Sequence, residues 1–77
     1  MKVNGYNVYC KHIIRCGKSQ YDTTYMVIVF TYLGQELYWS TTNKTKAARE
    51  LKAGEYYNLT WDQEGDMISR VKILEME

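Results

Sequence analysis

The run of residues 23–33 limits the possible folds more than any other feature of the chain. It reads Thr-Thr-Tyr-Met-Val-Ile-Val-Phe-Thr-Tyr-Leu. Nearly all of these are β-branched or aromatic residues, which pack well on the pleated surface of a sheet. Gly34-Gln35 follows, and Gly in the first position of a two-residue loop is typical of a type II′ turn. The sequence therefore predicts an antiparallel hairpin of strands 23–33 and 36–42.

A hairpin that pairs Leu33 with Glu36 has two distinct faces, because successive side chains of a strand point to opposite sides. One face carries aromatic and aliphatic side chains and is expected to form the core: Met26, Ile28, Phe30, Tyr32, Leu37 and Trp39. The other face is mixed and tolerates water: Tyr25, Val27, Val29, Thr31, Tyr38, Ser40 and Thr42.

Four further elements complete the pattern. Residues 6–15 alternate as a first strand and then break phase at Ile13-Ile14, which predicts a bulge near His12. Residues 45–52 form a short amphipathic helix, with an N-cap at Asn43 or Thr45 and Gly54 suited to the C-cap. Residues 55–61 and 67–74 read as a fourth and a fifth strand. The side chains expected to point inward from these last three elements are Ala47, Ala48, Leu51, Tyr57, Leu59, Trp61, Val71 and Ile73.

The order strand-strand-strand-helix-strand-strand resembles that of the OB-fold family. The best-matched stretch is residues 48–59, Ala-Arg-Glu-Leu-Lys-Ala-Gly-Glu-Tyr-Tyr-Asn-Leu, in which a Leu is followed by a Gly and an alternating strand. The resemblance implies an all-β fold, a five-stranded Greek-key barrel of the OB type with one short helix between strands 3 and 4. Residues 1–77 are expected to form this single domain. An SH3-like barrel is the alternative, although it usually lacks the helix.

Composition limits the setting and the chemistry. The chain has 77 residues, no run of the roughly 20 apolar residues that a membrane-spanning helix needs, and no apolar stretch of a secretory signal near its start. We therefore expect a cytoplasmic protein. Cys10 and Cys16 stand about 20 Å apart on an extended strand and are expected to be free, reduced thiols, unless the chain turns between them.

Catalytic and metal-binding patterns are not found in the sequence. Cys10, Cys16 and His12 are one ligand short of a structural zinc site. The acidic turn of residues 62–66 lacks the twelve-residue calcium loop, and no glycine-rich phosphate loop is present. Catalysis by a Cys/His pair needs a third, orienting group and a pocket. We expect no enzymatic activity, no cofactor and no metal.

Charge is uneven along the chain although the net charge is only +1. Residues 1–49 carry seven Lys or Arg against two acids, and residues 50–77 carry three against seven. This asymmetry predicts one basic and one acidic face. The resemblance to OB domains implies binding of single-stranded nucleic acid or oligosaccharide, through the outer face of strands 2 and 3 and the loops joining strands 1–2 and 4–5.

Single strands bind through aromatic faces and positive charge. The candidate binding residues are Lys11, Arg15, Lys18, Tyr21, Tyr25, Tyr38, Lys44 and Lys46. The first hypothesis is sequence-tolerant binding of single-stranded DNA or RNA, in a protein whose size fits a phage or other mobile element. The second is a protein-interaction module, such as an inhibitor or a subunit, that uses Val27, Val29, Tyr25 and Tyr38; a homo-oligomer is one form of it. Oligosaccharide binding fits the aromatic residues but not the basic half.

Overall fold

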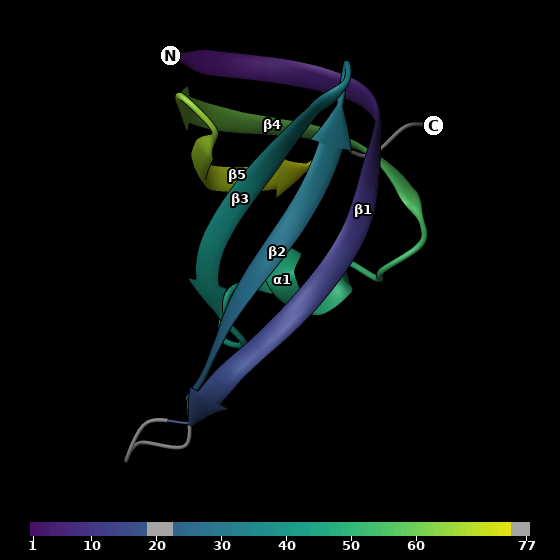
Figure 1. Ribbon diagram of the computed structural model, residues 1–77. Coiled ribbons are helices and arrows are strands. Elements are labelled where there is room, and N and C mark those ends of the chain that lie inside the picture. The colour runs from purple at the N-terminus through teal and green to yellow at the C-terminus, as the bar shows by residue number, and fades with distance from the viewer. Residues whose placement is uncertain (19–22, 75–77) are drawn as a thin grey trace.

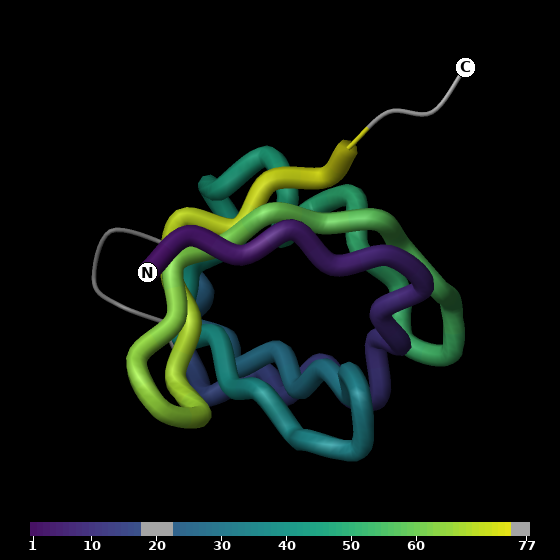
Figure 2. The backbone as a smooth tube through the Cα atoms, turned by 90° about the horizontal axis from the view of Figure 1, so that it is seen from above, coloured from purple at the N-terminus to yellow at the C-terminus, as the bar shows by residue number. Residues whose placement is uncertain are grey.

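Five strands close into a barrel in the computed structural model, which describes residues 1–18 (backbone only for Lys18) and 23–74. The elements are β1 (Lys2–Lys18), β2 (Thr24–Tyr32), β3 (Gln35–Thr42), α1 (Lys46–Glu50), β4 (Tyr56–Glu64) and β5 (Met67–Ile73). Around the barrel the order is β1-β2-β3-β5-β4, and the strands form a closed ring when viewed from above (Figure 2). This confirms the predicted fold class: an all-β, five-stranded barrel with one short helix between β3 and β4.

Strand β1 pairs with two different strands of the barrel. Its first residues pair with β4 and its later residues with β2, so the strand bends around the molecule (Figure 1). The bend lies at a bulge between Gly5 and Val8, where Asn7 adopts a left-handed φ of 58°. Asn tolerates this conformation better than most residues, and the Asn7 backbone N–H donates to Asn58 Oδ1 at 3.0 Å. A second irregularity between Cys10 and His12 confirms the predicted bulge.

The β2–β3 turn differs from the predicted one. Tyr32 pairs with Gln35, so the two loop residues are Leu33 and Gly34, with φ of 51° and 76°. Two positive φ angles define a type I′ turn, and the predicted type II′ turn at Gly34-Gln35 is wrong. The closing pair of the hairpin is one residue earlier on both strands than predicted, Tyr32–Gln35 in place of Leu33–Glu36. The pairing therefore differs by two residues in total, so every side chain stays on its predicted face.

The core contains the side chains that alternation placed inside. Both tryptophans are buried, Trp39 at 4% and Trp61 at 1% exposure, and they pack with Phe30, Ile28 and Leu37. Val29 corrects one expectation. It is only 5% exposed although it lies outside the core cluster, so neighbours on the outer surface cover it. Val29 is therefore not available to a partner as the interaction hypothesis required.

Helix α1 is shorter than predicted and packs Ala47 and Ala48 into the core. Thr45 is the N-cap residue, but its hydroxyl shares a 2.9 Å hydrogen bond with that of Thr41 and makes no capping bond. The C-cap is Leu51 in extended conformation, so Gly54, with φ of 90°, serves the turn before β4 and does not cap the helix. Within residues 1–18 and 23–74, no helix is long and apolar enough to cross a membrane.

The buried thiol of Cys10 predicts a loss of stability at alkaline pH. Burial raises the pKa of this thiol from about 9 to about 11. The protonated form is therefore favoured by folding, and this stabilisation is complete below pH ~9 and is lost as the pH rises towards ~11. Between pH 8 and about 10.5 the native protein should lose on the order of 2 kcal/mol more than a Cys10→Ala variant.

Urea unfolding of both proteins at the two pH values measures this difference. Parallel losses in the two proteins would contradict it. Thiol labelling provides a second check: Cys16 is exposed and should react at once, whereas Cys10 should react only on unfolding.

Candidate nucleic-acid interface

The outer surface of β1, β2 and β3 presents a continuous strip of aromatic, aliphatic and small polar side chains. Register places these residues in successive cross-strand rows: His12 with Val29 and Tyr38, Ile14 with Val27 and Ser40, and Gly17 with Tyr25 and Thr42. We call the exposed and half-buried members of this surface the β1–β3 face: His12, Ile14, Tyr25, Val27, Tyr38 and Ser40.

Tyr25 and Ile14 are the most open apolar side chains of the β1–β3 face. Tyr25 is 52% exposed and Ile14 is 51% exposed. The bulge after Cys10 sets the phase of β1, so that His12 and Ile14 point outward while Ile13 packs against the core. Tyr25 thus lies where alternation predicted, and His12 and Ile14 are additional members that only the phase break at Ile13-Ile14 signalled.

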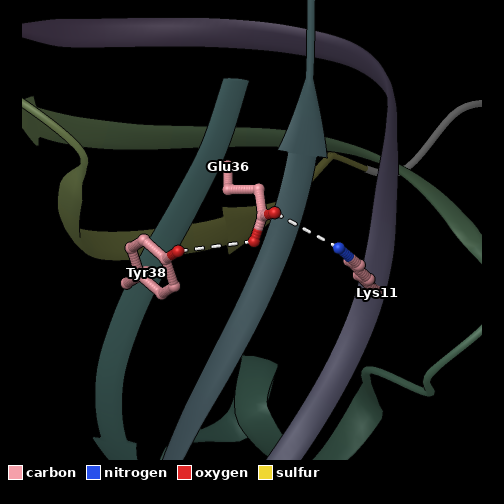
Figure 3. Close-up of polar contacts among 3 residues, drawn as sticks. All are labelled: Lys11, Glu36 and Tyr38. Atoms are coloured by element: carbon pink, nitrogen blue, oxygen red, sulfur yellow. Dashed lines mark hydrogen bonds and ion pairs between the residues drawn. The ribbon is translucent and has the colours of Figure 1, made fainter. Parts of the chain in front are cut away.

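Glu36 places a negative charge at the end of the β1–β3 face that is farther from Tyr25. Its carboxylate lies over the middle strand and joins side chains from the two neighbouring strands (Figure 3). Lys11 Nζ approaches Glu36 Oε1 at 3.2 Å, and the Tyr38 hydroxyl donates to Glu36 Oε2 at 3.3 Å. The negative charge of Glu36 is the main cause that raises the pKa of the Tyr38 phenol, and Asp66 adds a smaller effect. Lys11 and Tyr38 lie on the predicted surface, but both already have an anionic partner.

The remaining basic residues of the predicted site lie in three different parts of the structure. Lys44 is exposed in the turn after β3. It lies two residues after Thr42, the cross-strand partner of Tyr25. Arg15 is in register with the inward-facing Met26 and lies on the opposite side of β1 from Ile14. Lys46 borders a groove between α1 and β5. Tyr21 and the side chain of Lys18 lie outside the described residues.

Sequence reasoning missed an exposed tyrosine pair. The rings of Tyr9 and Tyr56 lie with centroids 5.0 Å apart, and Tyr56 is 66% exposed. Tyr9 is in register with Thr31 of β2, and Thr31 with Glu36 of β3, so the pair extends the outer surface sideways at the end where Glu36 lies. Strand alternation already predicts the position of Tyr56, because an inward Tyr57 requires that its neighbour Tyr56 points outward.

Among residues 1–18 and 23–74, no three His, Cys, Asp or Glu side chains are grouped as metal ligands would be. No protein-family model, curated protein or solved structure matches this chain. The geometry therefore defines a small closed β-barrel that exposes aromatic side chains along one three-stranded face.

Proposed function

We propose that the chain binds single-stranded DNA or RNA on the β1–β3 face, without catalysis and with little sequence preference. Successive bases stack on aromatic side chains, and every base has a π-face, so this mode of binding tolerates sequence. The observation that carries the proposal is that aromatic side chains lie at both ends of one outer surface, which consists of the β1–β3 face and the neighbouring Tyr9–Tyr56 pair. Tyr25 lies at one end and the Tyr9–Tyr56 pair at the other, with Ile14 and Val27 between them.

The length of the face suits a short single strand. Gly17, the partner of Tyr25, and Tyr9 are eight residues apart on β1, which is roughly 25 Å at about 3.3 Å per residue. An OB-type barrel binds about 4–16 nucleotides of a single strand. The Glu36 carboxylate lies near the Tyr9 end of this path and opposes phosphate, so one domain is expected to bind with modest affinity and a small salt slope.

The proposal is tested by fluorescence anisotropy with a labelled oligo(dT) of about 15 nucleotides. We expect saturable binding that weakens between about 50 mM and about 200 mM salt, since each phosphate contact releases counterions. A duplex of the same length serves as the control and should bind more weakly, because its bases are already stacked. No binding at the lower salt would refute the proposal.

A second candidate function is docking of a partner protein on the same face. The observation that favours it is Ile14, an aliphatic side chain 51% exposed beside the half-buried Val27. Such a contact would depend on Ile14 and Val27 and would be insensitive to salt, unlike contacts to phosphate groups. An absence of oligonucleotide binding, together with a concentration-dependent increase in mass, would favour this candidate in the form of a homo-oligomer.

Removing the charge of Glu36 should strengthen oligonucleotide binding. Glu36→Gln releases Lys11 and removes an anion from the path, and exposed ion pairs of this kind contribute about 0.2–1 kcal/mol. We expect an affinity gain of about two- to fivefold and a steeper salt slope. The pKa of Tyr38 should fall towards its ordinary value, which NMR of ring-labelled tyrosine measures independently of binding. A weaker-binding variant would contradict the assigned path.

A further inference from the structure

A small hollow lies at the end of the barrel where β1 ends, β2 begins and α1 packs. Its volume is about 300 Å³, and its rim carries Arg15 from β1, Arg49 from α1, Thr24 from β2 and Asn43 from the turn after β3. Its floor is apolar and includes Met26 and Leu51. Arg15 and Arg49 are both exposed side chains. Two arginines from separate elements therefore line one depression.

The polar groups around the hollow are mainly hydrogen-bond donors. Asn43 Oδ1 accepts the Thr24 backbone N–H at 3.2 Å, and the Asn43 backbone N–H donates to the Thr24 carbonyl at 3.0 Å. The Asn43 side-chain oxygen is thus bound to β2, and the amide group offers its NH₂ as a donor. None of the described residues that line the hollow is acidic, and Glu50, the neighbour of Arg49, borders the separate groove beside β5.

This arrangement matches the chemistry of a phosphate group. Guanidinium groups bind phosphate oxygens through paired, charge-assisted hydrogen bonds. Two arginines that line the same hollow contribute positive charge from two sides, and a phosphate bound between them is attracted by both.

The hollow adjoins the β1–β3 face. Thr24 and Met26 line it, and Tyr25 stands between them in β2 with its ring on the outer surface. We propose that the hollow formed by Arg15, Arg49 and Asn43 binds a phosphate group of the same strand whose bases stack on Tyr25. This inference rests on the proposed function. In this arrangement the nucleic-acid strand passes over the Thr24–Asn43 pair, from the stacking surface at Tyr25 to the phosphate site in the hollow.

The test compares Arg49→Gln with Lys72→Gln in the anisotropy titration. Both variants remove one positive charge from an exposed side chain, and Lys72 lies on β5, away from the hollow. Arg49→Gln should weaken oligo(dT) binding about tenfold and reduce the salt slope by about one, whereas Lys72→Gln should do neither. Circular dichroism spectra that match the native protein show that both variants are folded.

The outcomes separate the inference from the function on which it rests. Native binding with equal effects of the two variants would overturn the phosphate site and leave the proposed function intact. No binding by the native protein would overturn both. Oligonucleotides with and without a 5′-phosphate identify the source: a deficit of Arg49→Gln confined to the phosphorylated strand indicates a terminal phosphate, and a deficit with both strands indicates an internal one.

Discussion

Replacing Gly5 with valine is expected to unfold most of the protein, and Gly5→Ala is expected to cost about 3 kcal/mol. Gly5 is buried where β1 crosses β4, opposite Leu59. A Cβ at this position would come within 2.6 Å of Trp61 Cζ3 and 2.8 Å of Val8 Cγ2. Overpacking of a core typically costs about 1–3 kcal/mol. Trp61 is only 1% exposed and packs in the core, so its ring cannot move aside without disturbing its neighbours, and the upper end of this range applies.

Urea unfolding followed by tryptophan fluorescence measures the effect. Asn4→Ala is the matched control, because Asn4 is the exposed neighbour on the same strand and its replacement should change stability by less than about 0.5 kcal/mol. Gly5→Ala combined with Trp61→Phe should cost less than the two changes separately, since the smaller ring leaves room for the methyl group. Equal stability of Gly5→Ala and Asn4→Ala would show that the indole does not pack against this position.

Replacing Tyr25 with alanine is expected to produce the largest loss of oligonucleotide binding. Base stacking on an aromatic side chain is worth about 1–3 kcal/mol per base, which corresponds to a loss of roughly 5- to 150-fold in affinity. Tyr25→Phe keeps the ring and should bind within about twofold of the native protein. Tyr25 is 52% exposed, so neither change should lower the free energy of unfolding by more than about 1 kcal/mol.

Tyr6→Ala controls for a general effect of losing a surface tyrosine. Tyr6 is 57% exposed and lies near the bulge of β1, outside the β1–β3 face. It should bind oligo(dT) as the native protein does. Equal losses for the Tyr6 and Tyr25 variants, or a Tyr25→Phe variant as weak as Tyr25→Ala, would contradict stacking at Tyr25.

The faces of the hairpin could be predicted from the sequence, whereas the turn could not. Side-chain direction depends only on the two-residue period of a strand, so Phe30 and Trp39 were placed correctly although their partners were not. The turn depends on a leucine in left-handed conformation, which sequence preferences disfavour. The start of β1 was missed because Gly5 is a poor strand residue, and its place in β1 depends on the distant Trp61.

Part of the candidate site followed from the same periodicity. Tyr25 was placed on the outer surface by alternation alone. The link from Lys11 through Glu36 to Tyr38 was not predictable, because it joins β1 to β3 across the strand between them. The placement of Arg15 and Arg49 around one hollow depends on the register of Arg15 with Met26, which the bulge after Cys10 sets, and on the packing of α1 against the end of the barrel. No local pattern contains either relationship.

Amide chemical-shift mapping during an oligo(dT) titration tests both whether a strand binds and where. The largest perturbations are expected at Ile14, Tyr25, Val27 and Ser40, while Ser69 and Lys72 of β5, outside this face, stay unchanged. Perturbations confined to β4 and β5, or none at low salt, would contradict the assignment of the β1–β3 face.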